Sequence, residues 1–438
     1  MKRVKIGVLG AYRGTSLINY CKIAENAEVV AICEKNEATI ARHKAMMGGD
    51  KITYYTEFDQ FLTHDMDAVV LANYATEHAP FAIKCLRAGK HVYSEVLPCQ
   101  TMKEAVELVE AVEETGLVYA YGENFCYMPA PFEMSRLYRE GAIGELEYAE
   151  CEYGGSIEPE WPCLTYGNKD HWRNNTHANF YCTHSLGPII HMTGLRPVRV
   201  TGFEGKKIER NLRVGAKAGQ FGIEMVELEN GALIKSLHGY LYNHSTWYTV
   251  YGSKGRMESA REDAHAGSVN MLYVNNDEYS GQYRKEKESW KAYEPVLPLD
   301  EKSKAFGHGG GDFYAMHYFA EKILGDDDAD IIDVYEALDM GLAGMFAYRS
   351  VLQGGVPVDM PNLRDKAERD KWRNDTMCTD PKVAGDMLIP SFSLGNPDIP
   401  DEVYDRMKAL YQEALEQNTG HVAAQFLQNS PEKINEQK

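Results

Sequence analysis

The strongest constraint on the fold is a regular alternation of short apolar runs and helical stretches over residues 1–125. Apolar runs at 4–9, 28–33, 68–73, 91–93 and 118–121 are separated by segments with helical periodicity. This alternation is typical of parallel strands joined by crossover helices. We therefore predict an N-terminal α/β domain built on a doubly wound parallel sheet.

A glycine-containing loop follows the first predicted strand and leads into a helix. Gly10 and Gly14 lie in this loop, and Tyr12 occupies the second glycine position of the G-x-G-x-x-G pattern. Glycines let the backbone approach a pyrophosphate, which then rests on the amides at the helix start. We interpret the loop as the dinucleotide contact of a Rossmann domain, with all three residues at the cofactor.

Polar residues at the ends of the other predicted strands complete the expected cofactor site. Glu34 ends the second strand, where a carboxylate binds ribose hydroxyls and repels a 2′-phosphate. This favours NAD over NADP, although the adjacent Lys35 weakens the preference. The carboxyl ends of parallel strands share one edge of the sheet, where ligands bind. Four more residues are predicted there: Asn73, His78, Glu95 and Asn124.

The pattern changes after residue 121. Strand-like runs at 145–153, 198–203, 222–228, 232–242, 247–251 and 256–259 follow, mostly without helices between them. Such runs indicate an open, mostly antiparallel sheet in a C-terminal α+β domain. We predict an NAD-binding domain at 1–125, a substrate-binding domain at 126–360 and a polar, then helical, extension at 361–438.

Charge and composition exclude several classes of partner. The net charge of −19 repels nucleic acids and anionic lipid surfaces. No apolar run is long enough to span a membrane. The nine cysteines form no close-spaced framework and suggest reduced thiols in a cytoplasmic protein. We predict a small-molecule substrate, with neither nucleic acid nor membrane as a partner.

Several segments carry a family resemblance. Residues 88–98 resemble the A-G-K-H-V-x-x-E-K-P segment of the Gfo/Idh/MocA oxidoreductases, but Val96 replaces the lysine that contacts substrate in that family. Glycoside hydrolase family 109, an NAD-using branch, has E-V-P at this place. Further segments resemble that branch in the same order: Arg13-Gly14, residues 123–127, residues 179–188 and residues 308–313.

The resemblance implies a sugar chemistry based on oxidation. NAD takes a hydride from C3, the C2 proton becomes acidic, the C1 substituent is eliminated, water adds and the hydride returns. His184 is then the group that accepts the C3 hydroxyl proton, and Tyr181 is the C2 base. If a helix begins here, the two side chains share one face. Tyr181 needs a lowered pKa, which Arg173 or the nicotinamide is expected to provide.

The same resemblance implies the remaining site residues. Arg13, Glu95, Val96 and Asn124 correspond to cofactor contacts, and the glycine-rich stretch before Asp312 suggests a loop that closes over the site. The alternative is a helix start capped by Asp312. Four residues match substrate-contact positions: Arg173, Tyr153, Tyr127 and His244, the last in place of an expected tyrosine. Two tryptophans of the family are missing from residues 75–78, so the sugar stays open.

Three functions remain open at this stage. The first is a glycosidase that uses tightly bound NAD, and the second is a plain NAD-dependent sugar or polyol dehydrogenase, which Val96 disfavours. The third is a non-catalytic sugar or NAD sensor, which Tyr181 and His184 disfavour. His177, His184 and His191 recur every seven residues, but this is no standard ligand set, so we predict no metal. The open sheet suggests a homodimer or homotetramer.

Overall fold

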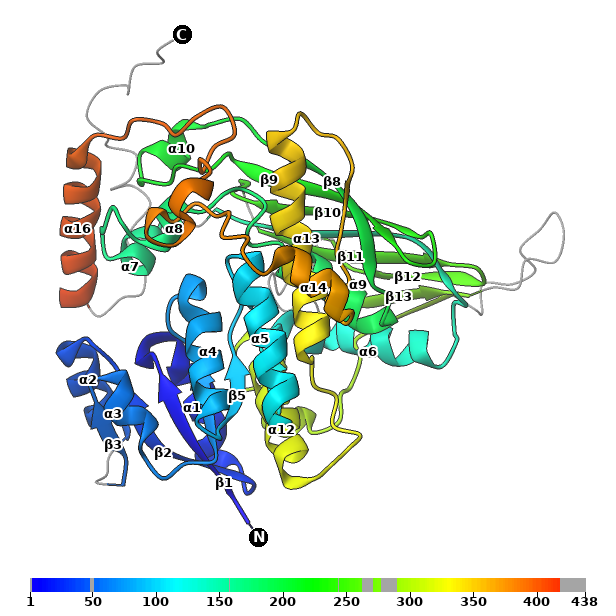
Figure 1. The fold of residues 1–438 in the computed structure, drawn as a ribbon. Helices are drawn as coiled ribbons and strands as arrows, with labels where there is room; N and C mark the ends of the chain where they lie inside the picture. Colours follow the sequence, from blue (N-terminus) through cyan, green and yellow to red (C-terminus); the bar gives the residue numbers. More distant parts are fainter. Residues whose placement is uncertain are drawn as a thin grey trace, which may run out of the picture.

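The computed structural model describes residues 2–47, 51–156, 158–242, 244–261, 271–276 and 290–417 (Figure 1). These residues form two sheets. The first has six parallel strands in the order β3-β2-β1-β4-β5-β6. This confirms the predicted doubly wound sheet. Its strands are β1 (Val4–Leu9), β2 (Ala27–Cys33), β3 (Thr53–Tyr55), β4 (Ala68–Leu71), β5 (His91–Ser94) and β6 (Tyr119–Tyr121).

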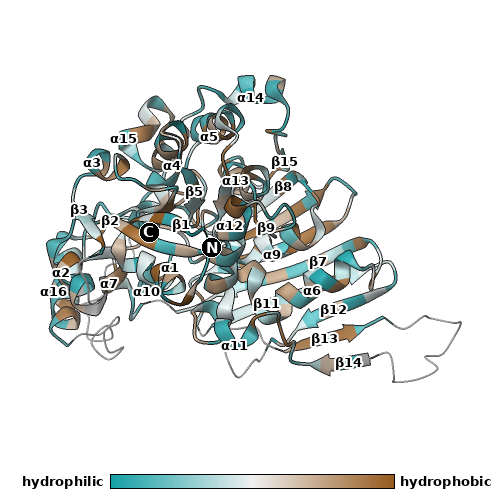
Figure 2. Ribbon diagram, turned by 90° about the horizontal axis from the view of Figure 1, so that it is seen from below, coloured by the Kyte–Doolittle hydropathy of each residue, from teal (hydrophilic) through white to brown (hydrophobic). Residues whose placement is uncertain are grey.

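Helices cover both faces of this sheet. Figure 2 shows α4 and α5 on one side of the strands and α1 on the other. Because both faces are covered, Val69 and Val70 in the centre are fully buried. The helices are α1 (Ala11–Ile23), α2 (Glu37–Met47), α3 (Phe58–Leu62), α4 (His78–Arg87) and α5 (Met102–Thr115), with the 3-10 turn η1 (Ala75–Glu77) before α4.

The second sheet has nine strands in the order β14-β13-β12-β11-β7-β10-β9-β8-β15. Only β7 and β10 pair in parallel, so the predicted mostly antiparallel sheet is confirmed. Its strands are β7 (Leu146–Gly154), β8 (Pro197–Glu204), β9 (Phe221–Leu228), β10 (Leu233–Gly239), β11 (Ser245–Gly252), β12 (Gly255–Ser259), β13 (Leu272–Asn275), β14 (Trp290–Tyr293) and β15 (Val358–Asp359).

Helices from the second half of the chain tie the two sheets together. α12 (Gly311–Leu324) packs on α1 and on the first sheet: Phe313 contacts Tyr20 of α1 and Phe319 contacts Tyr93 of β5, at ring distances of 5.3 and 5.7 Å. α13 (Val334–Leu352) packs on β8. The other helices are α6 (Pro129–Arg139), α7 (Trp161–Thr165), α8 (Trp172–Asn175), α9 (Thr183–Thr193), α10 (Glu209–Leu212), α11 (Asp300–Ser303), α14 (Lys366–Trp372), α15 (Pro381–Ala384) and α16 (Asp401–Glu416), with 3-10 turns η2 (Asn124–Tyr127), η4 (His308–Gly310) and η5 (Gly385–Met387).

The C-terminal helix α16 builds a small second core. Met407, Leu410 and Ala414 recur at helical spacing and are buried against Trp161 and neighbouring side chains of α7 and the α10 region. Both views place α16 beside α7 and across from α2 (Figures 1 and 2). Across the described ranges, no helix is both long and apolar enough to cross a bilayer.

The packing of β8 on α13 depends on a glycine. A Cβ on Gly202 would lie 2.0 Å from the Ala347 carbonyl oxygen, and the Gly202 amide donates to Ser350 Oγ at 3.0 Å. Replacing Gly202 with alanine should lower the free energy of unfolding by about 2–3 kcal/mol, because helix and strand must move apart. Urea unfolding measures the change. Phe203→Ala, at the exposed neighbouring position, is the control and should cost less; equal costs would contradict the packing argument.

Candidate active site

The glycine loop brings β1 and α1 into close contact with β4. Gly10 has a φ of 91°, and a Cβ there would lie 2.5 Å from the Ala72 carbonyl oxygen. A Cβ on Gly14 would lie 2.6 Å from Val8 Cγ1, so this glycine lets α1 pack on β1. Both glycines therefore serve backbone approach, as a dinucleotide loop requires. Tyr12 is half-exposed at the rim of this loop.

Glu34 lies beside the loop, at the end of β2. Its Oε2 accepts a hydrogen bond from the Ala11 amide at 2.9 Å, and its Oε1 accepts from the Asn36 amide at 2.9 Å. The first amide belongs to the start of α1, where the helix dipole favours a negative charge. Two backbone donors thus hold the carboxylate at the place predicted for the ribose contact.

A buried carboxylate, Asp312, links the loop to α12. Arg13 donates to both of its oxygens at 2.9 and 2.8 Å and also pairs with Glu95 at 2.8 Å. Asn124 Nδ2 donates to Asp312 at 2.7 Å, and His308 Nδ1 lies 3.2 Å away. Burial alone would raise the pKa of Asp312, but Arg13 holds it far below its usual range. Asp312 is therefore ionised.

The predicted capping role of Asp312 is wrong. α12 begins at Gly311 with Gly310 as its N-cap, and no side chain caps it. Asp312 instead lies inside the first turn and turns its carboxylate to Arg13. The sequence pattern shows that Asp312 stands at the start of a helix. It does not show that its hydrogen-bond partner is Arg13, which comes from a distant loop.

A buried histidine forms a hydrogen bond with the segment that follows β5. His78 is buried, and its Nδ1 donates to the Leu97 carbonyl oxygen at 2.9 Å. Burial lowers its pKa to about 4, so the ring is neutral. Val96 is buried and apolar, and offers only packing contacts. Asn73 lies beside this segment and donates to Glu77 at 3.3 Å.

His184 is held by a carboxylate that the sequence analysis did not assign. Its Nδ1 lies 2.7 Å from Glu123 Oε1, and Glu123 is fully buried. A carboxylate at Nδ1 favours the tautomer that leaves Nε2 free to accept a proton. Phe125 and Tyr153 pack on the imidazole at ring distances of 4.3 and 4.8 Å. The available signal was the position of Glu123, two residues after β6 on the same sheet edge.

Tyr181 lies next to His184, at a ring distance of 5.0 Å. α9 begins only at Thr183, so Tyr181 precedes the helix and does not share its face as expected. Arg173 lies over the phenol ring at 5.3 Å. Burial raises the pKa of Tyr181 above its ordinary value, and Arg173 lowers it by less. The expected net lowering by Arg173 is therefore not found.

The predicted substrate residues separate into two groups. Tyr153 packs on His184, and His244 lies against Gly155, just beyond the end of β7 that carries Tyr153. Tyr127 is placed elsewhere. Its hydroxyl donates to the Asp330 carbonyl oxygen at 2.7 Å, and its ring is buried against His191. The structure therefore does not bring Tyr127 to the cluster.

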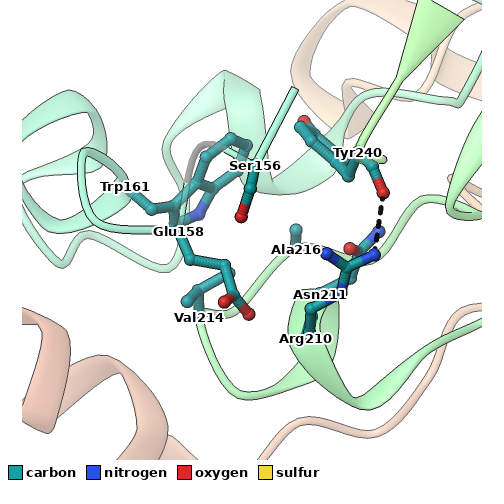
Figure 3. A pocket seen from close by; sticks show the side chains of 8 residues that line it. All are labelled: Ser156, Glu158, Trp161, Arg210, Asn211, Val214, Ala216 and Tyr240. Carbon is teal, nitrogen blue, oxygen red and sulfur yellow. Dashed lines mark hydrogen bonds between the residues drawn. The ribbon is translucent and has the colours of Figure 1, made fainter. Parts of the chain in front are cut away.

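A hollow lies between α7, α10 and the end of β10. Trp161 and Tyr240 meet edge to face at 5.3 Å, and Arg210 donates to the Tyr240 carbonyl oxygen at 3.3 Å (Figure 3). The hollow is lined by Ser156, Glu158, Trp161, Arg210, Asn211, Val214, Ala216 and Tyr240. None of these residues was predicted for the active site.

The carboxyl edge of the first sheet fits a dinucleotide. Four buried polar atoms near it have no hydrogen-bond partner within the described ranges: Asn73 Oδ1, His78 Nε2, Glu123 Oε2 and Asn124 Oδ1. Unpaired buried polar atoms are rare and usually await a ligand, water or ion. Together with the glycine loop and Glu34, they suit a ligand with several hydroxyl and amide groups. In the same described ranges, no group of three or more histidine, cysteine or acidic residues is arranged to hold a metal ion.

Two family models match the chain. Residues 4–123 match the NAD-binding Rossmann fold of the Gfo/Idh/MocA oxidoreductase family, and residues 199–374 match the C-terminal domain of glycosyl hydrolase 109. The chain pairs a Gfo/Idh/MocA domain with a glycosyl hydrolase 109 domain. It is an NAD-binding enzyme.

Curated relatives cover most of the chain. A glycosyl hydrolase family 109 protein from Shewanella sp. (strain ANA-3) is 27% identical over 395 residues, which are 83% of this chain and 86% of the relative. An alpha-N-acetylgalactosaminidase from Shewanella oneidensis is 25% identical over 395 residues, covering 83% and 85%.

Solved structures share the fold of this chain. Aldose-aldose oxidoreductase from Caulobacter crescentus has a TM-score of 0.65 and 18% identity, covering 82% of this chain and all of that one. Myo-inositol 2-dehydrogenase from Lactobacillus plantarum has a TM-score of 0.63 and 16% identity, with 82% and 100% coverage. At this identity the likeness concerns the fold.

The Asp312 network gives a stability prediction. Asp312→Asn should lower the free energy of unfolding by about 2–4 kcal/mol, because Arg13 loses a buried, doubly bonded partner. Asp359→Asn is the matched control, since the Arg199–Asp359 pair is exposed, and should cost less than about 1 kcal/mol. Urea unfolding compares the two. Similar costs would contradict the assigned role of Asp312.

His78 gives a pH prediction. The unfolded chain binds a proton at His78 near pH 6.5, whereas the folded protein resists until about pH 4. The contribution of His78 is therefore complete above pH 6.5 and is lost as the pH falls toward 4. His78→Asn keeps a donor for the Leu97 carbonyl and should flatten the decrease in stability between pH 7 and 5. Identical pH profiles in urea unfolding would contradict this assignment.

Proposed function

We propose that this enzyme hydrolyses glycosides through oxidation at C3, with NAD kept in the site through the cycle. One observation carries the proposal: the buried Glu123–His184 pair, with the Tyr181 ring 5.0 Å from the imidazole. Glu123 and Asn124 follow β6 and lie on the sheet edge where the dinucleotide fits. A proton acceptor and a phenol thus stand together beside the expected nicotinamide.

Each proposed residue has one task. When bound, NAD accepts a hydride from C3 of the sugar and later returns it. His184 takes the C3 hydroxyl proton on Nε2, while Glu123 stabilises the resulting imidazolium. The C3 ketone makes the C2 proton acidic, and Tyr181 removes that proton as the C1 substituent leaves. Water then adds to C1, the C2 proton is restored, and the net reaction is hydrolysis.

Arg173, Tyr153 and His244 are proposed substrate contacts. Arg173 lies over the Tyr181 ring, so it favours the phenolate and also offers donors to sugar hydroxyls. Tyr153 packs beside the imidazole and limits how the sugar ring enters. The relative named alpha-N-acetylgalactosaminidase supports an N-acetylhexosaminide as the first substrate class to test.

A plain NAD-dependent sugar dehydrogenase is the second candidate. Burial raises the pKa of Tyr181, which makes the phenol a reluctant base and favours a reaction that needs only His184 and Glu123. Against it stands Val96, a buried apolar residue in place of the substrate lysine of many polyol dehydrogenases.

A cytoplasmic location and a dimeric or tetrameric assembly stay predictions.

The two candidates differ in the fate of the hydride. The enzyme should release nitrophenol from a panel of nitrophenyl glycosides in deuterated water without added NAD, beginning with the α-N-acetylgalactosaminide. NMR should find deuterium at C2 of the product sugar. Accumulation of one NADH per sugar oxidised, dependent on added NAD, would instead establish the dehydrogenase.

Variants separate the steps of the same reaction. Tyr181→Phe should abolish C2 exchange and hydrolysis, while the bound NAD is still reduced on mixing with substrate. Glu123→Gln should slow that reduction by about 10³-fold, because His184 loses its charge partner. Tyr242→Phe, at a position that is 79% exposed, is the matched control and should leave both rates unchanged. Hydrolysis by Tyr181→Phe at the wild-type rate would contradict the assigned base.

A further inference from the structure

A continuous row of aromatic rings runs from the C-terminal helix to the proposed catalytic residues. Neighbouring ring centroids are separated by 5.3, 5.9, 5.9, 6.3 and 5.0 Å, distances at which aromatic rings pack in contact. The row consists of Tyr411, Tyr166, His171, Trp172, Tyr181 and His184. The segment 161–172 and α16 therefore form one layer that leads to the reaction centre.

This layer contacts the dinucleotide-binding edge directly. Tyr74 follows Asn73 at the end of β4, and its ring packs edge to face on His171 at 4.6 Å. At the other end of the row, Tyr166 lies within electrostatic reach of Glu34 and Tyr12, which border the glycine loop. The row thus extends over the sheet edge from the proposed ribose carboxylate to the proposed nicotinamide end.

α16 is held in this position by close packing. Gly167 has a φ of 64°, and a Cβ there would lie 2.2 Å from the backbone nitrogen of Lys408 in α16. The hydroxyl of Tyr404 donates to the Gly215 carbonyl oxygen at 3.1 Å. Lys169 pairs with Asp401 at 3.1 Å. These contacts fix the position of α16 against the segment 161–172, although the apolar core beneath the helix is small.

We propose that the rings of Tyr166 and Tyr411 form one wall of the adenosine subsite, and that the packing of α16 holds both rings in place so that NAD dissociates slowly. Through His171, Tyr166 is linked to Tyr74 at the end of β4, and both phenols lie within electrostatic range of Glu34, so a ribose bound to that carboxylate would have its adenine on their side of the sheet edge. Aromatic side chains stack well on nucleic acid bases. This deepens the proposed glycosidase function, and rests on it, because a redox-neutral cycle requires a cofactor that remains bound between turnovers.

The test measures cofactor release without any sugar. The full-length protein is loaded with NADH and mixed with excess NAD, and the decay of NADH fluorescence gives the dissociation rate. Tyr411→Ala should release NADH about tenfold faster. Tyr411→Phe keeps the ring and should release it at nearly the wild-type rate. Leu415→Ala, at an exposed position on the same helix, is the matched control and should leave the rate unchanged.

A second variant tests whether the position of α16 matters when both tyrosines are kept. Gly167→Ala must displace α16 and should accelerate NADH release as Tyr411→Ala does. Wild-type release rates in Tyr411→Ala and Gly167→Ala would overturn the proposal. The assay contains no glycoside, so its outcome is independent of the nitrophenol experiment. Slow NADH release in a protein that does not hydrolyse glycosides would contradict the proposed function and leave the adenosine wall in place.

Discussion

The Asp312 carboxylate holds together three parts of the chain that are far apart in sequence. It accepts two hydrogen bonds from Arg13 in the loop after β1 and one from Asn124 after β6, and it stands at the start of α12. A buried carboxylate is stable only when its charge is matched and its oxygens are bonded. Arg13 also binds Glu95, so one guanidinium fixes the glycine loop, the segment after β5 and α12 relative to each other.

The proposed catalytic groups lie beside this network, and each is oriented by a neighbour. Glu123 fixes the imidazole of His184, and Arg173 lies over the ring of Tyr181. The pKa of Tyr181 is nevertheless raised by burial, so the protein alone does not prepare a phenolate. In the proposed reaction the cofactor is already reduced, and its nicotinamide neutral, when the C2 proton is removed, so Arg173 is the cation beside the phenol at that step.

The packing of α16 explains what the C-terminal extension contributes to the structure. α16 packs on a small core of its own, separate from the larger core that the two sheets share. Its partner is the segment 161–172, which also carries the aromatic row toward Tyr181. The extension and the reaction centre therefore share one layer, and the sequence pattern of a polar tail followed by a helix gives no hint of this.

The sequence by itself determined the two sheets and the position of polar residues at the ends of the parallel strands. Strand periodicity is local, so β1, β2, β5 and β7 were predicted to within a few residues, whereas the three-residue β3 was too short to be found. Glu34 lies directly after β2 as predicted, and its contact with the ribose stays a prediction. Only the tertiary structure decided the partners: Glu123 for His184, Arg13 for Asp312, and the Asp330 carbonyl for Tyr127. The physical reason is that a buried polar group takes the nearest partner that folding supplies, and that partner is set by packing between distant segments.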